Sequence, residues 1–100
     1  MNTSLDDLVA GADRALDAMH GAAEALSAIR VVRRSDDASL TVTVDGSGAL
    51  VGLELAPDLS RESATRLATA IVATASAAAQ EALEQRASIL ENMQGSLTAT

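Results

Sequence analysis

The chain of 100 residues contains no cysteine and no lysine, and its formal net charge is −7. The length fits one domain, and the missing cysteines exclude a disulfide framework and a thiolate metal site. An acidic chain is also a poor general ligand for polyanions, because non-specific affinity for DNA comes from neutralised phosphates.

The apolar residues are small. The sequence has no Phe, Tyr or Trp, and alanine makes up nearly half of the 48% of residues that are hydrophobic. Because alanine buries little area, each core position contributes little transfer free energy, and the core of a chain of this length is thin. Sharing a core with a second copy is the usual remedy, so we expect a homodimer.

The chain shows no targeting or membrane signal. Asp6 and Asp7 stand where a signal peptide has positive charge followed by an apolar run. The most apolar helical window, 67–79, is too short and too rich in alanine to span a bilayer. We therefore expect a cytoplasmic protein with no membrane partner.

A long first helix is predicted from Ser4 to about Arg30. Ser4 followed by Asp7 fits a capping box in its less common acidic form, and apolar residues then recur at three- and four-residue steps. Two apolar rows repeat every seven residues, a pattern that suits a coiled-coil-like seam. One row is Leu5, Ala12, Met19 and Leu26, and the other is Leu8, Ala15, Ala22 and Ile29.

Residues 31–35 fit either a last helical turn or a third strand, and the local pattern leaves both open. A clearer signal follows, because Leu40, Val42 and Val44 alternate with polar residues in the period of a half-buried strand. This alternation predicts a hairpin with strands over 39–45 and 49–56.

The sequence DGSG at 45–48 supplies the turn of the hairpin, since Asp and Gly tolerate the positive φ values of tight turns. The second strand is expected to place Val51, Leu53 and Leu55 on one face and to end at Pro57. Gly46 and Gly48 fit this turn better than a phosphate loop, which requires a following helix and a Lys.

A longer second helix is predicted from about Ser60 to residue 94, with Asp58 or Ser60 as its N-cap and Gly95 as its stop. At roughly 1.5 Å per residue this helix overhangs the short hairpin and must pack on something else. We expect one domain over 1–100, ordered over about 4–94, with 95–100 as a flexible tail.

The expected dimer interface lies on the apolar faces of the hairpin and the second helix. Small residues of the second helix allow a close helix contact. The interface residues are Leu40, Val42, Val44, Leu67, Ile71, Ala75 and Ala78.

Three arginines, Arg30, Arg33 and Arg34, form the one basic cluster of the sequence. In one interpretation they contact DNA phosphates where helix meets sheet, and the dimer doubles them. In the other they complement the dipole of the first helix and pair with Asp36 and Asp37. The remaining arginines are scattered among acids and are expected to be solvated.

No group of residues points to catalysis, a cofactor or a metal. His20 has no second ligand at metal-binding spacing, and the acidic residues are typical of solvated helix faces. We expect a protein that is not an enzyme and has no catalytic residue, cofactor, metal or small-molecule substrate.

The order helix, hairpin, long helix resembles the YbaB/EbfC family of bacterial nucleoid-associated proteins over about residues 5–94. The hairpin carries the likeness through Leu40, Val42, Val44, Gly46, Gly48, Leu50, Leu53, Leu55 and Pro57. The resemblance implies an α+β fold with an antiparallel sheet of about three strands between two helices. It also implies an intertwined homodimer with projecting arms that binds double-stranded DNA in the nucleoid with little sequence preference.

Two departures from the family pattern favour an alternative. The usual glycine-rich stretch is replaced by RRSDD at 33–37, and the last helix has alanine where the family is rich in Lys and Glu. The lysine-free, alanine-rich composition resembles that of actinobacterial relatives. The alternative is a dimeric scaffold or chaperone-like module, linked to type VII secretion, that binds a protein partner and has lost DNA binding.

Overall fold

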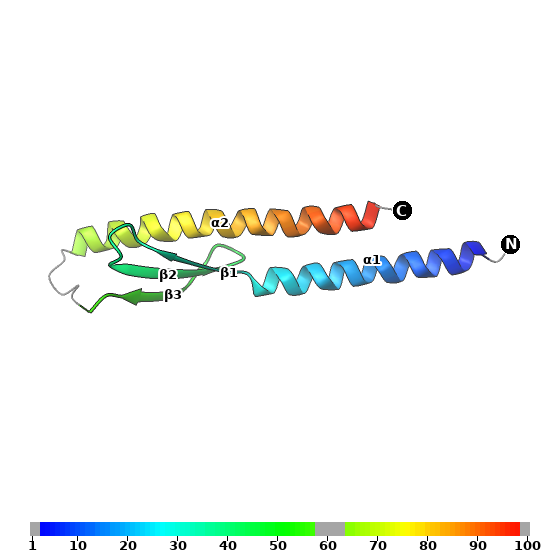
Figure 1. Cartoon of the computed structure of the whole chain (residues 1–100), viewed down its shortest axis with the longest axis horizontal. Helices are drawn as coiled ribbons and strands as arrows, with labels where there is room; N and C mark the ends of the chain where they lie inside the picture. The colour runs from blue at the N-terminus through cyan, green and yellow to red at the C-terminus, as the bar shows by residue number, and fades with distance from the viewer. Residues whose placement is uncertain (1–2, 58–63, 99–100) are drawn as a thin grey trace.

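The computed structural model describes residues 3–57 and 64–98. Two helices enclose three strands in sequence, which confirms the α+β fold (Figure 1). The elements are α1 (Thr3–Ala28), β1 (Arg30–Arg34), β2 (Leu40–Asp45), β3 (Leu50–Leu55) and α2 (Ala64–Thr98). The molecule is a rod of 77 × 17 × 15 Å. Neither of the described helices is long and apolar enough to cross a membrane.

The first helix starts earlier than predicted and ends where the β-branched residues Ile29, Val31 and Val32 begin. α1 already includes Thr3, so Ser4 lies inside its first turn and not at the preceding cap position. It ends at Ala28, and the amide of Ile29 bonds to the carbonyl of Leu26 at 3.4 Å. The stiff β-branched side chains of Val31 and Val32 suit a strand, and pairing with β2 makes residues 30–34 the strand β1 and not a helix extension.

The strands form an antiparallel sheet in the order β1-β2-β3. In its register Val42 lies opposite Arg33 on one side and Leu53 on the other. The pairing then passes from Thr43–Gly52 to a Val44–Leu50 pair. Val51 has no partner in this register and is the extra residue of a β-bulge, so the regular pairing expected along the hairpin is interrupted there.

The β2–β3 turn uses the predicted residues. The amide of Gly48 donates to the carbonyl of Asp45 at 3.0 Å, and Gly48 has a φ of 83°. The Asp45 carboxylate accepts hydrogen bonds from the amides of Ser47 (2.9 Å) and Ala49 (3.1 Å). Gly46 is needed for space, because a Cβ there would lie 2.8 Å from the carbonyl oxygen of Leu26.

The second helix begins, in the described residues, at Ala64, and its predicted start and cap near Asp58 and Ser60 lie outside them. The predicted stop at Gly95 is wrong, since α2 continues to Thr98. Glycine weakens a helix by about 1 kcal/mol but does not force it to end. Beyond it, the hydroxyl of Thr98 donates to the carbonyl of Gln94 at 3.0 Å.

One face of the sheet packs on the N-terminal half of α2. The side chains of Leu40, Val42 and Val44 are fully buried there against Ala78 and Ala82. α2 packs chiefly over β1 and β2. The core is as thin as the composition predicts, and it leaves the β3 side of the same sheet face uncovered.

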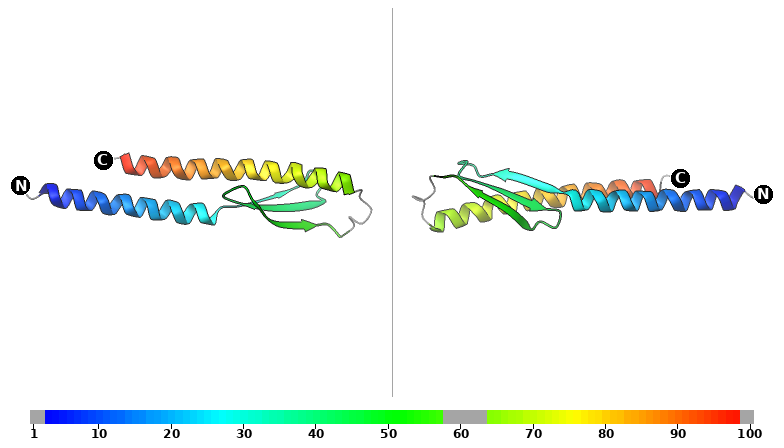
Figure 2. Two further views of the ribbon diagram at one scale, coloured as in Figure 1. Left: turned by 180° about the vertical axis from the view of Figure 1, so that it is seen from behind. Right: turned by 90° about the horizontal axis from the view of Figure 1, so that it is seen from below.

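The other half of α2 runs antiparallel to α1. The two helices lie side by side in all three views, both chain ends lie at the same end of the rod, and α1 extends beyond α2 (Figures 1 and 2). We call α1 together with residues 83–98 of α2 the arm, and the strands together with residues 64–82 the sheet end.

Candidate nucleic-acid interface

β1 places the three arginines on an exposed edge strand. Arg33 lies opposite Val42, so it shares the sheet face that packs on α2. Arg30 and Arg34 lie opposite Asp45 and Thr41, on the open face. All three side chains are exposed, and the edge presents positive charge on both faces.

Arg30 is tied to the end of the first helix. Its Nη1 donates to the carbonyl of Ile29 at 2.6 Å and to that of Ser27 at 3.4 Å. A guanidinium is favourable at this place, where the helix dipole is negative. Arg30 also lies near Asp45, whose pKa is lowered first by the Ser47 hydroxyl and amide and, to a smaller extent, by the Arg30 charge.

Arg33 pairs across elements and not with the neighbouring acids. Its Nη1 lies 3.8 Å from Oε2 of Glu81 on α2, and both side chains are about half exposed. Such a pair contributes little to stability because water screens it. Arg34 makes no ion pair and no hydrogen bond with the described residues, so its side chain is available to a ligand.

Asp37, which the second interpretation pairs with the arginines, instead accepts hydrogen bonds within the turn that follows β1. Its Oδ1 accepts hydrogen bonds from the Ser35 hydroxyl at 2.8 Å and from the Ser39 amide at 3.0 Å. Hydrogen bonds from Ser39, and then from Ser35, lower the pKa of Asp37 to about 2. The same turn holds Ala38 at a φ of 59°.

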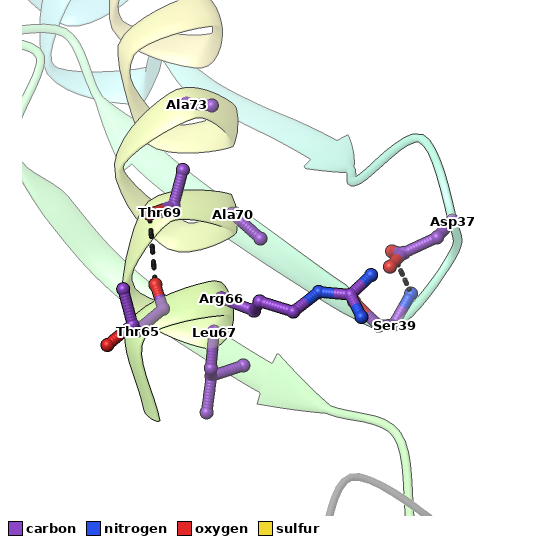
Figure 3. Close-up of a pocket in the computed structure, with 8 residues that line it drawn as sticks. All are labelled: Asp37, Ser39, Thr65, Arg66, Leu67, Thr69, Ala70 and Ala73. Atoms are coloured by element: carbon purple, nitrogen blue, oxygen red, sulfur yellow. Dashed lines mark hydrogen bonds between the residues drawn. The ribbon is translucent and has the colours of Figure 1, made fainter. Parts of the chain in front are cut away.

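A further arginine, Arg66, approaches this turn from α2. The Arg66 side chain extends toward Asp37 and Ser39 (Figure 3). Thr65 and Thr69 lie beside it on the same helix, where the Thr69 hydroxyl donates to the Thr65 carbonyl. An adjoining hollow is lined by Arg33 and Arg34 and shares Asp37 as a wall. The sequence did not predict a place for Arg66 at this site. Arg66 is far from β1 in the chain, and no local pattern indicates that it approaches the 35–39 turn.

Arg86, like Arg66, was expected from the sequence to be solvated and not to be part of a binding site. It lines a shallow hollow together with Arg30 and Asp45, at the junction of the arm and the sheet end. It therefore adds positive charge beside β1.

Charge is distributed unequally along the rod. The arm holds seven acidic residues, Asp6, Asp7, Asp13, Asp17, Glu24, Glu84 and Glu91, against two arginines, Arg14 and Arg86. Of the other described basic residues, Arg30, Arg33 and Arg34 lie on β1 and Arg66 lies near the start of α2. Among the described residues, the charges therefore favour a polyanion around β1 more than along the arm.

No metal or catalytic group emerges in the part of the chain that the structure describes. No three His, Asp or Glu side chains gather there in a way that could hold an ion. His20 lies exposed on α1.

The residues expected at a dimer interface occupy two different places. Leu40, Val42, Val44 and Ala78 lie at 0–1% exposure inside the protomer's own core. Leu67, Ile71 and Ala75 are half-buried on α2.

A set of apolar side chains beside them remains open to solvent. Leu50, Leu53 and Leu55 lie opposite buried residues of β2, on the α2 side of the sheet, yet are 41–47% exposed. Val72 of α2 is 65% exposed. We call these four residues the sheet-end apolar surface.

The described part of the chain is a small α+β fold with an exposed edge of arginines, an arrangement that suits the binding of a polyanion. The chain belongs to the YbaB/EbfC DNA-binding family, whose model matches residues 1–97. This is a family of DNA-binding proteins and not of enzymes, which confirms the resemblance seen in the hairpin. No curated protein matches the chain significantly in sequence.

Proposed function

We propose that the chain acts as a homodimer that binds double-stranded DNA with little sequence specificity and is located in the nucleoid of a bacterial cytoplasm. The observation that carries this proposal is the placement of Arg30, Arg33 and Arg34 on one exposed edge strand. The arm carries more acidic than basic residues, so the sheet end around β1 is the place where a duplex meets favourable charge.

The chemistry of β1 favours contact with the DNA backbone. A guanidinium can donate two hydrogen bonds to one phosphate, and such contacts position a protein without reading the base sequence. Without aromatic residues the chain lacks the stacking platform of single-strand binders.

The sheet-end apolar surface supports dimerisation. α2 covers β1 and β2, and the leucines of β3 extend the same apolar layer beyond it. A second α2 fits over these leucines. Val72 and its neighbours Ala75 and Ala79 would then face the first α2, and their small side chains allow close helix packing.

A two-fold dimer of this kind doubles the basic edge. Each protomer contributes its own β1, so six arginines would face DNA, in two sets related by symmetry. Two sets raise the affinity for a long polyanion above that of one set. This compensates in part for the net charge of −7.

Fluorescence anisotropy with a labelled duplex of about 30 base pairs tests the proposal. We expect saturable binding at low salt that does not depend on the duplex sequence. Arg34→Ala should weaken binding about tenfold, as loss of a charged hydrogen bond predicts. Arg14→Ala removes the same charge from the arm and is the matched control, which should bind nearly as the wild type. Equal binding by both variants, or none by the wild type, would contradict the proposal.

A further inference from the structure

The arm leaves its larger apolar side chains out of its own helix contact. α1 meets α2 through a row of small residues, and Ala18, Ala22 and Ala25 share a hollow with Ile89 and Met93. Gly11 and Ala15 continue this row toward the N-terminus. Small side chains bring the helix axes close together, and the bulkier residues of α1 are therefore placed elsewhere.

The bulkier residues form exposed rows on both helices. On α1 the exposed fractions are 65% for Leu5, 53% for Val9, 51% for Leu16 and 47% for Met19. On α2 they are 52% for Leu83 and 37% for Leu97. The half-buried Leu90 lies between these two at seven-residue spacing.

The two rows lie on the same side of the helix pair. Each residue of an α-helix is rotated by about 100° about the helix axis relative to the residue before it. Measured in the sense of this rotation, the apolar row of each helix lies about 100° past the row that contacts the other helix. Because α1 and α2 are antiparallel, this equal rotation carries both rows to one side. We call the seven residues of the two rows the arm face.

Acidic side chains border the arm face on both sides. Asp6, Asp13, Asp17 and Glu24 form a row along the outer side of α1, next to its apolar row. Glu84 and Glu91 lie on the outer side of α2, seven residues apart. Of the two arginines of the arm, Arg86 lies at the junction with the sheet end, near Arg30 and Asp45. Arg14 lies on the side of α1 opposite its apolar row, as the rotation of about 100° per residue places it.

These borders disfavour both a polyanion and a second arm as the occupant. DNA phosphates would meet carboxylates on either side. Two copies of the arm packed face to face would place acidic borders against acidic borders, and like-charge contacts of this kind weaken or exclude a pairing.

We propose that the arm face binds an amphipathic helix of a partner protein, with an apolar stripe bordered by Lys or Arg on both sides. A helix laid in a groove between two helices buries such a stripe, and opposite border charges fix its register. The α1 row from Leu5 to Met19 spans about 21 Å, the length of a partner helix of about 14 residues. This role is independent of DNA binding at β1.

The test uses the full chain and a fluorescein-labelled synthetic peptide of about 18 residues. The probe has leucine at the a and d positions and lysine at the e and g positions of a heptad repeat. One control peptide has the same composition with the stripe permuted, and another has glutamate for lysine. We expect saturable binding of the probe, one per chain, at least about tenfold tighter than either control in anisotropy titrations.

Two variants locate the binding. Val9→Ser with Leu16→Ser removes apolar contacts on the exposed side of α1 and should weaken probe binding by about tenfold or more. Asp13→Asn with Asp17→Asn keeps the apolar row and should weaken binding and reduce its salt dependence. Ala10→Ser, on another side of α1, is the matched control. Circular dichroism checks that each variant stays helical.

Three results would overturn the proposal: equal binding of the probe and the permuted peptide, an unchanged affinity in both double variants, or a chain dimer that Val9→Ser with Leu16→Ser dissociates. The last result would assign the arm face to a second copy. The same variants are also titrated with a DNA duplex. The arm substitutions should leave DNA binding at β1 unchanged, so this titration distinguishes failure of the arm proposal from failure of the proposed function.

Discussion

Nη1 of Arg33 lies 3.8 Å from Oε2 of Glu81, so one of the three edge arginines already faces a carboxylate of α2. The pair connects the edge of the sheet to the helix that covers it. It also competes with any phosphate for the same guanidinium. On the proposed function, Glu81 of the acidic helix therefore lowers the affinity of the basic edge for DNA.

Replacing Glu81 by Gln should strengthen DNA binding. The substitution frees Arg33 and removes a negative charge beside it, so we expect affinity for the duplex to rise about three- to tenfold. The free energy of unfolding should change by less than about 0.5 kcal/mol, because an exposed pair stabilises little. Glu91→Gln, on the arm, is the charge-matched control. A rise of the same size in both variants would show a general charge effect and not release of Arg33.

A charge on the sheet-end apolar surface should dissociate the dimer. Val72→Asp places a carboxylate where the proposed dimer packs a second copy, and an unpaired charge in an interface is strongly unfavourable. We expect sedimentation velocity to show a monomer at concentrations where the wild type is a dimer. Val32→Asp introduces the same charge at a residue of equal exposure, 65%, on the open face of the sheet. Dissociation by Val32→Asp alone would place the interface on that open face instead.

Two Gly→Ala substitutions should change stability in opposite directions. A Cβ at Gly46 would lie 2.8 Å from the Leu26 carbonyl oxygen and 3.2 Å from Cδ1 of Ile29. Gly46→Ala should therefore reduce the free energy of unfolding by about 1–3 kcal/mol. A Cβ at Gly21 meets no atom within 4 Å, and in a helix Ala is favoured over Gly by about 0.5–1 kcal/mol. Urea denaturation at one fixed protein concentration measures both; a stabilising Gly46→Ala would contradict the packing at the hairpin turn.

The turn after β1 should contribute to stability in a pH-dependent way. The folded pKa of Asp37, about 2, is below its usual 3.8, so the folded state binds this proton less readily than the unfolded state. The contribution is therefore complete above about pH 4 and is lost as the pH falls toward 2. The slope of unfolding free energy against pH between 2 and 4 should be shallower in Asp37→Asn than in Asp36→Asn, which removes the same charge. Equal slopes would show that the serine hydrogen bonds do not favour the ionised form.

The elements with strong local signals could be predicted from the sequence. The alternation of Leu40, Val42 and Val44 and the DGSG turn gave a hairpin within one residue of the observed strands. The ambiguity over 31–35 could not be resolved locally, since a five-residue apolar and basic run fits either structure. Pairing with β2 decides it in favour of a strand.

Long-range relationships could not be predicted. Two seven-residue rows of α1 indicated a coiled-coil-like seam, and periodicity did not show which of them meets α2. Ala22 of one row lies at the helix contact, whereas Leu5 and Met19 of the other row are exposed. Periodicity shows which residues share a face and not which face a partner covers. The pairing of Arg33 with Glu81 and the approach of Arg66 to the 35–39 turn likewise depend on how α2 lies on the sheet.

The salt dependence of duplex binding tests the central claim most directly. The logarithm of the association constant should fall linearly with the logarithm of salt concentration, by about 0.9 per phosphate contact. The account predicts a clear slope for the wild type and a slope several units shallower when Arg30, Arg33 and Arg34 are all alanine. Binding with equal slopes in both proteins, or no binding by the wild type at about 50 mM salt, would contradict it.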